Sequence, residues 1–376
     1  MSDAPPRTYL SPAMPYWLSV LLVPLIALVA AQGGAWLLLM PLSTWWLFMC
    51  LDAATPNDTR NADPMTDETA LWAHKLLTLL WVPLQYGVIF GLIWYATRAD
   101  HLSTAEQIGL FAGVGILSGT IGINYAHELM HQRNRQERWA ADLLLASVLY
   151  SHFRSEHLLV HHRYVGTPRD PVSARYNENF WRFFVRVLWS CPASAWAAET
   201  GLLARKDRPW WDRANPFWRY FWLQSACLVA AIALGGGAGL GLFILQAGVA
   251  VWQLELVNYV EHYGLTRRHL GEGRYEPVGP RHSWNSTQRA SNWLLINLQR
   301  HSDHHYKPDR RFPLLQARAG EAPELPAGYP VMTLAALLPP VWRRVMNPRV
   351  RAWRRAHYPD VSDWAPYNQA ANPLPR

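Results

Sequence analysis

The sequence predicts an all-α integral membrane protein, with six transmembrane helices in three hairpins and a histidine-rich cap on the cytoplasmic side. Three observations predict this architecture. Charged residues are absent from several long apolar runs, basic residues gather on one side of those runs, and nine of the 15 histidines cluster just outside them. We expect residues 1–376 to form a single membrane-embedded domain.

Long uncharged runs define the predicted spans. Residues 8–51 contain no Lys, Arg, Asp or Glu, and a Gln-Gly-Gly break at residues 32–34 interrupts them. Because one span takes about 20 apolar residues, this run predicts a hairpin. Residues 220–254 are again double length, with three glycines at residues 235–237. The six predicted spans are residues 14–32, 35–52, 76–97, 107–126, 217–235 and 239–260.

The distribution of Lys and Arg predicts the orientation. With an even number of spans, both termini lie on one side, together with the predicted cap of residues 127–216 and 261–376. The cap is rich in Arg, whereas the turns predicted on the other side contain only Arg98. The positive-inside rule therefore places both termini and the clustered histidines in the cytoplasm. Within the cap, residues 176–200 are aromatic and amphipathic and suit a helix in the membrane interface.

The clustered histidines predict a metal centre. Residues 298–305 place histidines at i, i+3 and i+4, and residues 157–162 repeat this HxxxHH form. On an α-helix these imidazoles project from one face within one turn, and neutral imidazole is the commonest metal ligand. A single HxxxH pair often arises by chance, but three clusters do not. Nine ligands are too many for one ion, so we expect two. The candidate ligands are His127, His131, His157, His161, His162, His262, His301, His304 and His305.

Polar neighbours of these clusters are candidates for outer contacts. Four acidic residues adjoin clustered histidines and could accept the outer N–H of a ligand from another segment, which fixes its tautomer. Three asparagines precede cluster histidines by three or four residues and could hold a metal-bound water. The alternatives are that the acidic residues are solvated in loops and that the asparagines pack against neighbouring helices. The candidates are Glu128, Glu156, Glu261, Asp303, Asn124, Asn258 and Asn297.

Ligation by several imidazoles restricts which metals and which reactions the site suits. It suits Zn, Cu, Fe or Ni, and closed structural zinc sites usually include cysteine. Two such metals beneath an apolar bundle suit oxygen activation on an apolar substrate that enters from the bilayer. Trp45 and Trp46 in the second span could line the substrate cavity, although Trp is also frequent at membrane interfaces.

Several motifs extend beyond the histidine spacing. Residues 258–265 read NYVEHYGL, residues 298–305 read LQRHSDHH, and residues 282–286 between them read HSWNS. GEGRY at residues 271–275 and LPAGYP at residues 325–330 accompany them. These motifs resemble the integral-membrane non-haem di-iron family of fatty-acid desaturases and hydroxylases, and within it the AlkB-type alkane 1-monooxygenases of bacteria.

The resemblance implies an O2-dependent oxidoreductase of the bacterial cytoplasmic (inner) membrane. It implies that the nine histidines bind two iron ions, with no catalytic side chain beyond the metal centre. The expected reaction is terminal hydroxylation of medium- to long-chain n-alkanes to primary alcohols. His152 and His282 match recurrent histidines outside the ligand set and are outer-contact candidates. Three departures from the family motifs, Met130, Gln132 and Val160, bear on the natural substrate.

The resemblance also implies a separate electron donor, rubredoxin, with its reductase. The chain contains no flavin or nicotinamide fingerprint, and its three cysteines are too far apart for an iron–sulfur site. A cationic surface near the motifs would attract an acidic carrier, whereas no nucleic-acid motif accompanies it. Orientation and contact with membrane lipids are the alternative role of these arginines. They are Arg133, Arg135, Arg138, Arg163, Arg310 and Arg311.

The sequence is also compatible with other interpretations of the site. Xylene-type monooxygenases and fatty-acid omega-hydroxylases belong to the same di-iron family. Residues 127–131 formally match HExxH, with Glu128 as a base, which suggests an intramembrane zinc protease but leaves six clustered histidines unexplained. A metal transporter would hold its site near the bilayer midplane, whereas these histidines lie at span ends and in loops.

Overall fold

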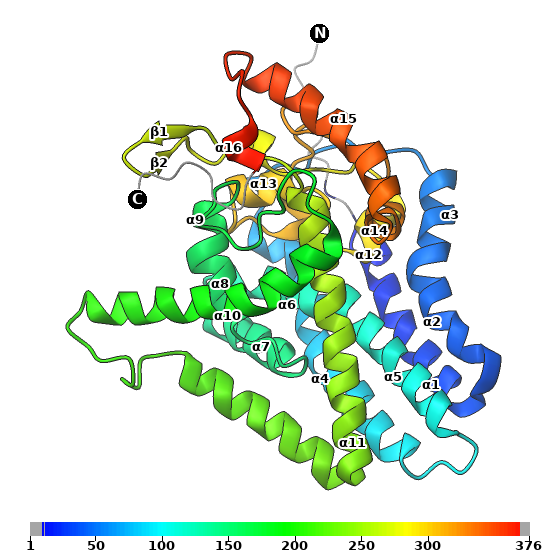
Figure 1. The fold of residues 1–376 in the computed structure, drawn as a ribbon. Coiled ribbons are helices and arrows are strands. Elements are labelled where there is room, and N and C mark those ends of the chain that lie inside the picture. The colour runs from blue at the N-terminus through cyan, green and yellow to red at the C-terminus, as the bar shows by residue number, and fades with distance from the viewer. Residues whose placement is uncertain (1–9, 11, 369–376) are drawn as a thin grey trace.

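The structure is a computed structural model that describes residues 10 and 12–368. Figure 1 shows several long helices in the lower part of the molecule, and short segments together with one long C-terminal helix above them. The predicted helical fold is confirmed, apart from one small antiparallel hairpin in the upper part. Its strands are β1 (His269–Gly271) and β2 (Arg274–Tyr275).

Five helical stretches among the described residues are long and apolar enough to cross a membrane. Each of the first four predicted spans lies in its own stretch. The stretches are Met14–Gln32, Gly34–Ala54, Glu68–Ala96, Thr104–Met130 and Phe217–His262. Their elements are η1 (Met14–Leu21), α1 (Leu22–Gln32), η2 (Gly34–Leu38), α2 (Leu39–Pro41), η3 (Leu42–Trp46), α3 (Leu47–Ala54), η4 (Glu68–Leu71), α4 (Trp72–Ala96), α5 (Thr104–Leu117), η5 (Ser118–Ile123), α6 (Asn124–Met130) and α11 (Phe217–His262).

The last two predicted spans lie within one helical element, α11, which has 46 residues. Its backbone leaves the helical conformation at Gly236, with φ 60° and ψ −147°. This left-handed φ favours glycine, which explains the glycine run at the turn. Figure 1 shows the two arms of α11 diverging from this point. The structure therefore contains the predicted break inside its fifth membrane-type stretch.

A capping box starts the fourth stretch and ties it to the first hairpin. The Ser103 hydroxyl accepts a hydrogen bond from the Glu106 backbone N–H, and Glu106 accepts one from the Ser103 N–H. The second oxygen of Glu106 accepts the Gly34 N–H at 2.7 Å. The turn between the first two stretches is therefore fixed against the start of α5.

Two glycines let η5 and the end of α5 pack closely on α11. A Cβ atom on Gly115 would lie 2.7 Å from the Gln246 carbonyl oxygen, and one on Gly119 would lie 3.0 Å from that of Ala250. Such small residues permit close backbone contact between membrane helices. This contact fixes the relative positions of the helices that end at the histidines of α6 and α11.

The remaining helical elements pack beside the membrane-type stretches and around the end of α11. Buried Trp342 of α15 packs on Tyr259 and Tyr263, with ring centroids 5.2 and 5.3 Å apart. The elements are α7 (Arg135–Ala146), α8 (Phe153–Glu156), η6 (His157–His161), α9 (His162–Tyr164), α10 (Phe180–Ala204), η7 (Pro280–His282), α12 (Arg289–Leu294), α13 (His301–Tyr306), η8 (Phe312–Leu314), α14 (Tyr329–Ala336), α15 (Pro339–His357) and α16 (Ala365–Asn368).

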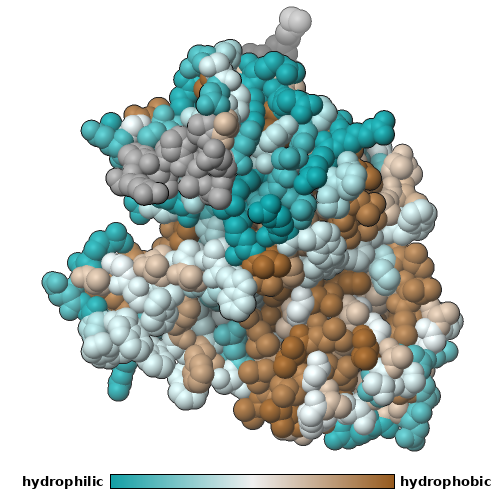
Figure 2. Space-filling view, in the orientation of Figure 1, coloured by the Kyte–Doolittle hydropathy of each residue, from teal (hydrophilic) through white to brown (hydrophobic). Residues whose placement is uncertain are grey.

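The surface polarity follows the same division. Figure 2 shows hydrophobic residues over the lower helices and hydrophilic residues over the upper part. Because apolar side chains exposed on long helices suit lipid rather than water, the chain is a multi-pass membrane protein. α10, which lies between the two parts in Figure 1, exposes an apolar face, as predicted for an interfacial helix. That face consists of Trp181, Val185, Leu188, Trp189 and Trp196.

Candidate metal centre

Nine histidines form two groups in which ring nitrogens converge. Within each group, one nitrogen of every member lies within 4.8 Å of those of the other members. These are the nine histidines that the sequence singles out. The five-histidine group contains His127, His131, His157, His162 and His304, and the four-histidine group contains His161, His262, His301 and His305.

A π-helical turn divides the cluster at residues 157–162 between the groups. In η6 the backbone N–H of His162 donates to the carbonyl of His157, which is an i+5 contact. The wider turn brings the Nε2 atoms of these two histidines to 2.9 Å, whereas His161 joins the other group. The i, i+4 pair His157 and His161 is therefore divided between the two groups.

α13 contributes to both groups and holds them next to each other. The Nε2 atoms of His301 and His305, at i and i+4, are 3.0 Å apart in the four-histidine group. His304 instead places its Nε2 atom 3.1 Å from that of His162 in the five-histidine group. The three rings lie together on one face of α13, with centroids 4.6–5.7 Å apart, but they are shared between the two groups. His262, the last residue of α11, completes the contact, with its Nε2 atom 3.1 Å from that of His301.

The convergence of nitrogens fits bound metal ions. The Nε2 atom of His157 lies 2.9–3.0 Å from those of His127, His131 and His162. One ring nitrogen carries either one proton or one lone pair, so it cannot make three ordinary hydrogen bonds at once. The buried Nε2 atom of His161 has no hydrogen-bond partner among the described residues. A cation within each group would satisfy these atoms, and the residues therefore fit the metals that the sequence predicts.

The protonation of the cap histidines also suits metal binding. Burial, with the positive charge of neighbouring imidazoles as a smaller cause, lowers the pKa well below its usual value. Neutral imidazole has a free lone pair, which a metal ion requires. This holds for His157, His162, His301, His304 and His305.

Asp170 supports the four-histidine group and was missed by the sequence analysis. Its Oδ2 atom lies 3.0 Å from Nδ1 of His161 and also accepts a hydrogen bond from the Ser173 hydroxyl. Both Asp170 and His161 are buried. This contact on the outer ring nitrogen leaves Nε2 facing the other histidines, as in carboxylate–histidine–metal arrangements. Asp170 is nine residues from His161 and adjoins none of the clustered histidines, so the sequence carries no local signal for this contact.

Glu261 lies on the inner side of the four-histidine group. Its Oε2 atom is 3.3 Å from Nε2 of His301, the nitrogen that faces His262 and His305. Its Oε1 atom accepts the Tyr329 hydroxyl at 2.8 Å. The structure therefore places this carboxylate among the converging nitrogens, whereas the sequence analysis predicted a contact with an outer N–H.

The other three acidic candidates do not contact the histidine groups by hydrogen bonds. Glu128 accepts from the Gln132 amide at 2.9 Å. Asp303 accepts from the Arg318 guanidinium at 2.8 Å. Both oxygens of Glu156 are buried, with no hydrogen-bond partner among the described residues. Glu128 is therefore not arranged as the base of an HExxH zinc site.

The candidate amides and remaining histidines bind protein groups. His282 is buried, accepts the Gly279 N–H at 2.9 Å and lies 3.2 Å from Glu276. His152 packs on the ring of Tyr150. Both histidines lie outside the two groups. The Nδ2 donations of the asparagines are from Asn124 to the Leu295 carbonyl, from Asn258 to Glu255, and from Asn297 to the Tyr16 hydroxyl.

An apolar cavity adjoins both histidine groups. It lies between η5 and the second arm of α11, and His127, His157 and His301 form one side of it. Trp46 is 62% exposed on the outer surface, and Trp45 is half-buried. Neither of them lines this cavity, because η3 lies away from the contact between η5 and α11. Its other lining residues include Gly119, Ile123, Phe153, Leu254, Val257 and Leu298.

Two of the six arginines expected to attract a carrier are internal ion-pair partners. Arg311 is buried, and its Nη1 atom donates to Glu137 at 2.9 Å. Arg310 is bonded to buried Asp303. The prediction that both contribute to a docking surface is therefore corrected, since their charges are neutralised inside the cap. Arg133, Arg135 and Arg163 are exposed, and Arg138 is half-buried.

Comparisons with known proteins agree with this site. The Fatty acid desaturase family model matches residues 102–335. Alkane 1-monooxygenase 2 of Pseudomonas aeruginosa is 36% identical over 90% of this chain and 92% of its own. Alkane 1-monooxygenase 2 of Alcanivorax borkumensis is 36% identical, covering 90% of each chain.

A more distant relative belongs to the xylene-type branch. The xylene/toluene monooxygenase hydroxylase component XylM of Pseudomonas putida is 28% identical over 85% of this chain. Both the family match and the alkane 1-monooxygenases cover the segments that bear the histidine groups. The chain therefore belongs to the fatty acid desaturase family, in its AlkB-type alkane 1-monooxygenase branch, and is an oxidoreductase of the monooxygenase class.

Proposed function

We propose that the protein hydroxylates the terminal methyl group of medium- to long-chain n-alkanes to primary alcohols, with O2 as oxidant. The observation on which this rests is the position of two histidine groups beside one apolar cavity. The relatives named alkane 1-monooxygenase support the choice of substrate class. An alkane has no polar group for recognition, so it requires a site defined by shape and apolar contact.

The metals in this proposal are two non-haem iron ions, one in each histidine group. When bound, such ions supply the reduction of O2 and the cleavage of an unactivated C–H bond. The five- and four-histidine groups would hold them through neutral imidazoles. Asp170 orients His161, and Glu261 is within reach of the four-histidine group through its Oε2 atom.

The cavity residues perform the positioning. Ile123, Leu254 and Val257 present apolar side chains to the substrate, and the close contact of η5 with α11 excludes water from it. Asn258 and Glu261 line the same cavity on the side of the four-histidine group. This arrangement of apolar and polar lining residues would place the methyl group to be oxidised at the histidines and the rest of the alkane between the helices.

The proposed arrangement in the membrane follows the sequence prediction. The two arms of α11 are the fifth and sixth spans, which gives three hairpins in a single domain of residues 1–376. Both termini and the histidine-bearing cap lie in the cytoplasm, and the membrane is the bacterial inner membrane. The basic surplus of the cap and the single Arg98 among the opposite turns support this orientation.

The proposed electron donor is a separate rubredoxin, which its reductase reduces. Each turnover consumes two electrons, and the chain has only three dispersed free cysteines, Cys50, Cys191 and Cys227. The exposed Arg133, Arg135 and Arg163, together with the half-buried Arg138, offer positive charge to an acidic carrier.

A product assay tests the proposal. Purified protein in lipid nanodiscs receives O2, a rubredoxin, its reductase and NADH, with n-alkanes, fatty acids or xylene offered in separate reactions. Primary alcohols from n-alkanes, labelled from ¹⁸O2, are the expected products. Preferred oxidation of the xylene methyl group or of fatty acids would transfer the protein to one of those alternative activities.

A further inference from the structure

α10 carries a second apolar concavity on the side opposite its exposed tryptophans. We call it the α10 trough, and its volume is about 360 Å³. Successive residues of a helix point about 100° apart, so residues 194, 197 and 201 share one face while Trp181 and Trp196 occupy the other. The trough is lined by Leu159, Val160, Arg163, Tyr164, Ser194, Ala197, Ala198, Gly201, Leu202 and Arg205.

The trough floor is open at Gly201. A Cβ atom there would meet no other atom within 4 Å, so the space above this residue can hold a ligand. From Ser194 to Arg205 the helix extends roughly 16 Å, which suits one extended alkyl chain. Leu159 and Val160, the other apolar lining residues of note, belong to η6.

The rim of the trough is cationic. Arg163 and Arg205 line it, and both are exposed. Arg163 and Arg169 place their guanidinium groups 5.2 and 5.5 Å from the ring of Tyr164. Within the described part of the chain, none of these three arginines has a carboxylate within 4.0 Å. An apolar trough with unpaired positive charges at its edge suits a chain with an anionic end.

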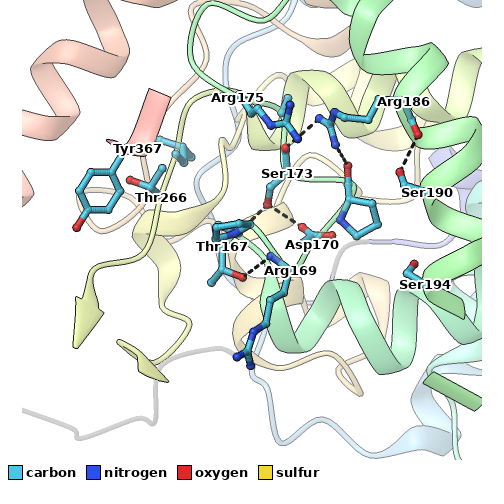
Figure 3. A pocket seen from close by; sticks show the side chains of 15 residues that line it. Thr167, Arg169, Asp170, Ser173, Arg175, Arg186, Ser190, Ser194, Thr266 and Tyr367 are labelled. Atoms are coloured by element: carbon cyan, nitrogen blue, oxygen red, sulfur yellow. Dashed lines mark hydrogen bonds between the residues drawn. The ribbon is translucent and has the colours of Figure 1, made fainter. Parts of the chain in front are cut away.

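A polar pocket of about 250 Å³ continues from the trough through Ser194, which lines both. Figure 3 shows Arg175 and Arg186 side by side in this pocket, with Ser190 and Ser194 on α10. Glu178 binds Arg186 through both carboxylate oxygens, at 3.0 and 2.9 Å. The half-buried Arg175 guanidinium is left without a hydrogen-bond or ion-pair partner among the residues described.

Asp170 also lines this pocket, but its oxygens are already engaged. Oδ2 contacts His161 and Ser173, and Oδ1 accepts the Val172 N–H at 3.0 Å. Among the described residues, Arg175 therefore has no direct partner for its guanidinium, and the Glu178 carboxylate acts on it only at longer range, because Glu178 is bonded to Arg186 and to the Arg175 backbone N–H. A half-buried arginine beside a second arginine favours an anion that can accept two hydrogen bonds from its planar fork.

We propose that the trough and the pocket together bind a long-chain carboxylate, with its alkyl chain along α10 and its carboxylate at Arg175. A single-chain molecule fits better than a phospholipid, because the trough faces away from the exposed apolar face of α10. The binding site does not depend on the proposed function. The biological meaning of the binding site does rest on the proposed function, since oxidation of a primary alcohol product would generate such carboxylates.

A photoreactive dodecanoate with a diazirine near its chain end tests the site directly. The full-length protein in lipid nanodiscs is labelled without donor or substrate, and labelled peptides are identified by mass spectrometry. Label is expected in residues 159–164 and 194–205. Unlabelled dodecanoate should compete with it, whereas methyl dodecanoate, which lacks the charge, should compete poorly.

Matched variants separate the trough from general lipid contact. Gly201→Leu places a side chain in the open space and should reduce labelling about tenfold, and Arg175→Gln should do the same by removing a charged partner. Gly248→Leu is the control, because Gly248 is also exposed on a helix with no atom within 4 Å of a Cβ. Unchanged thermal unfolding verifies that each variant is folded.

Three results would overturn the proposal. Gly201→Leu and Gly248→Leu could be labelled equally, or label could be confined to the cavity residues Ile123 and Leu254. Phosphatidylglycerol could displace the label where dodecanoate does not, which would identify a phospholipid as the occupant. Because no turnover takes place, none of these results depends on whether the protein hydroxylates alkanes.

Discussion

At the scale of single residues, the metal centre depends on side chains that lie outside the histidine pattern. Asp170 contacts the outer nitrogen of His161 at 3.0 Å, and both side chains are buried. The nine histidines are recognisable because their spacing is unusual for a protein core. Asp170 is not, because its role depends on a loop between α9 and α10 that brings it back to η6. The spacing of histidines along the chain therefore predicts the metal ligands better than it predicts the residues that orient those ligands.

Asp170→Asn is expected to weaken metal binding while leaving the fold intact. The amide keeps the volume but lacks the negative charge that favours the Nδ1–H tautomer of His161. Loss of such a partner typically lowers metal affinity by about 10- to 100-fold. Iron content after dialysis against a graded chelator measures the effect. Retention identical to the wild type would remove Asp170 from the metal centre.

Charge reversal at Arg311 is expected to destabilise the protein rather than weaken donor binding alone. Arg311 donates to buried Glu137, and Arg311→Glu would place two carboxylates together there. Breaking a buried ion pair costs about 3–5 kcal/mol. Thermal unfolding in nanodiscs should show a large decrease. Arg133→Glu is the control, since its ion pair with Asp309 is largely exposed. Equal stability of the two variants would contradict the structural role.

At the scale of secondary structure, helix positions were predictable and helix types were not. Apolar runs predict where the membrane-type stretches lie, because lipid demands continuous apolar length, but not their ends, since the third begins at Glu68 rather than at residue 76. They do not distinguish an α-turn from a π-turn, which differ by one residue in hydrogen bonding. η6 and η5 are both π-helical. The π-helical turn of η6 places His157 and His162 in one group, which an i, i+4 spacing does not predict.

The cavity that we propose for the substrate lies between the two elements η5 and α11. Shortening Leu254, which lines it, by Leu254→Ala should lengthen or broaden the range of alkanes oxidised. Trp46→Ala should leave the range unchanged, because Trp46 is exposed outside the cavity. The distribution of alcohols from a mixture of alkanes measures both. A shift for Trp46→Ala alone would place the substrate along the second stretch instead.

At the scale of the whole molecule, segregation of charge predicts the division into a membrane part and a cap. Figure 2 shows that division as a change in surface polarity. The sequence does not predict which cap arginines are free, because ion pairing depends on tertiary contacts. Arg310 and Arg311 are close to a motif in sequence, yet both are paired with acids inside the cap.

Donor-dependent turnover is expected to fall as salt increases. The exposed arginines would steer an acidic rubredoxin, and salt shortens the Debye length from about 30 Å at 0.01 M to about 8 Å at 0.15 M. Turnover at limiting rubredoxin, measured across this range, should decrease, while the Michaelis constant for the alkane stays constant. A rate independent of salt would place the docking surface on uncharged residues.

The central claim is that two groups of histidines each hold one iron ion. The direct measurement is the number of metal ions per chain, by inductively coupled plasma mass spectrometry, in the wild type and in His304→Ala and His357→Ala. Two iron ions per chain are expected in the wild type and in His357→Ala, because His357 lies outside both groups, and a clear loss of iron is expected in His304→Ala. One zinc ion per chain, or full iron content in His304→Ala, would contradict it.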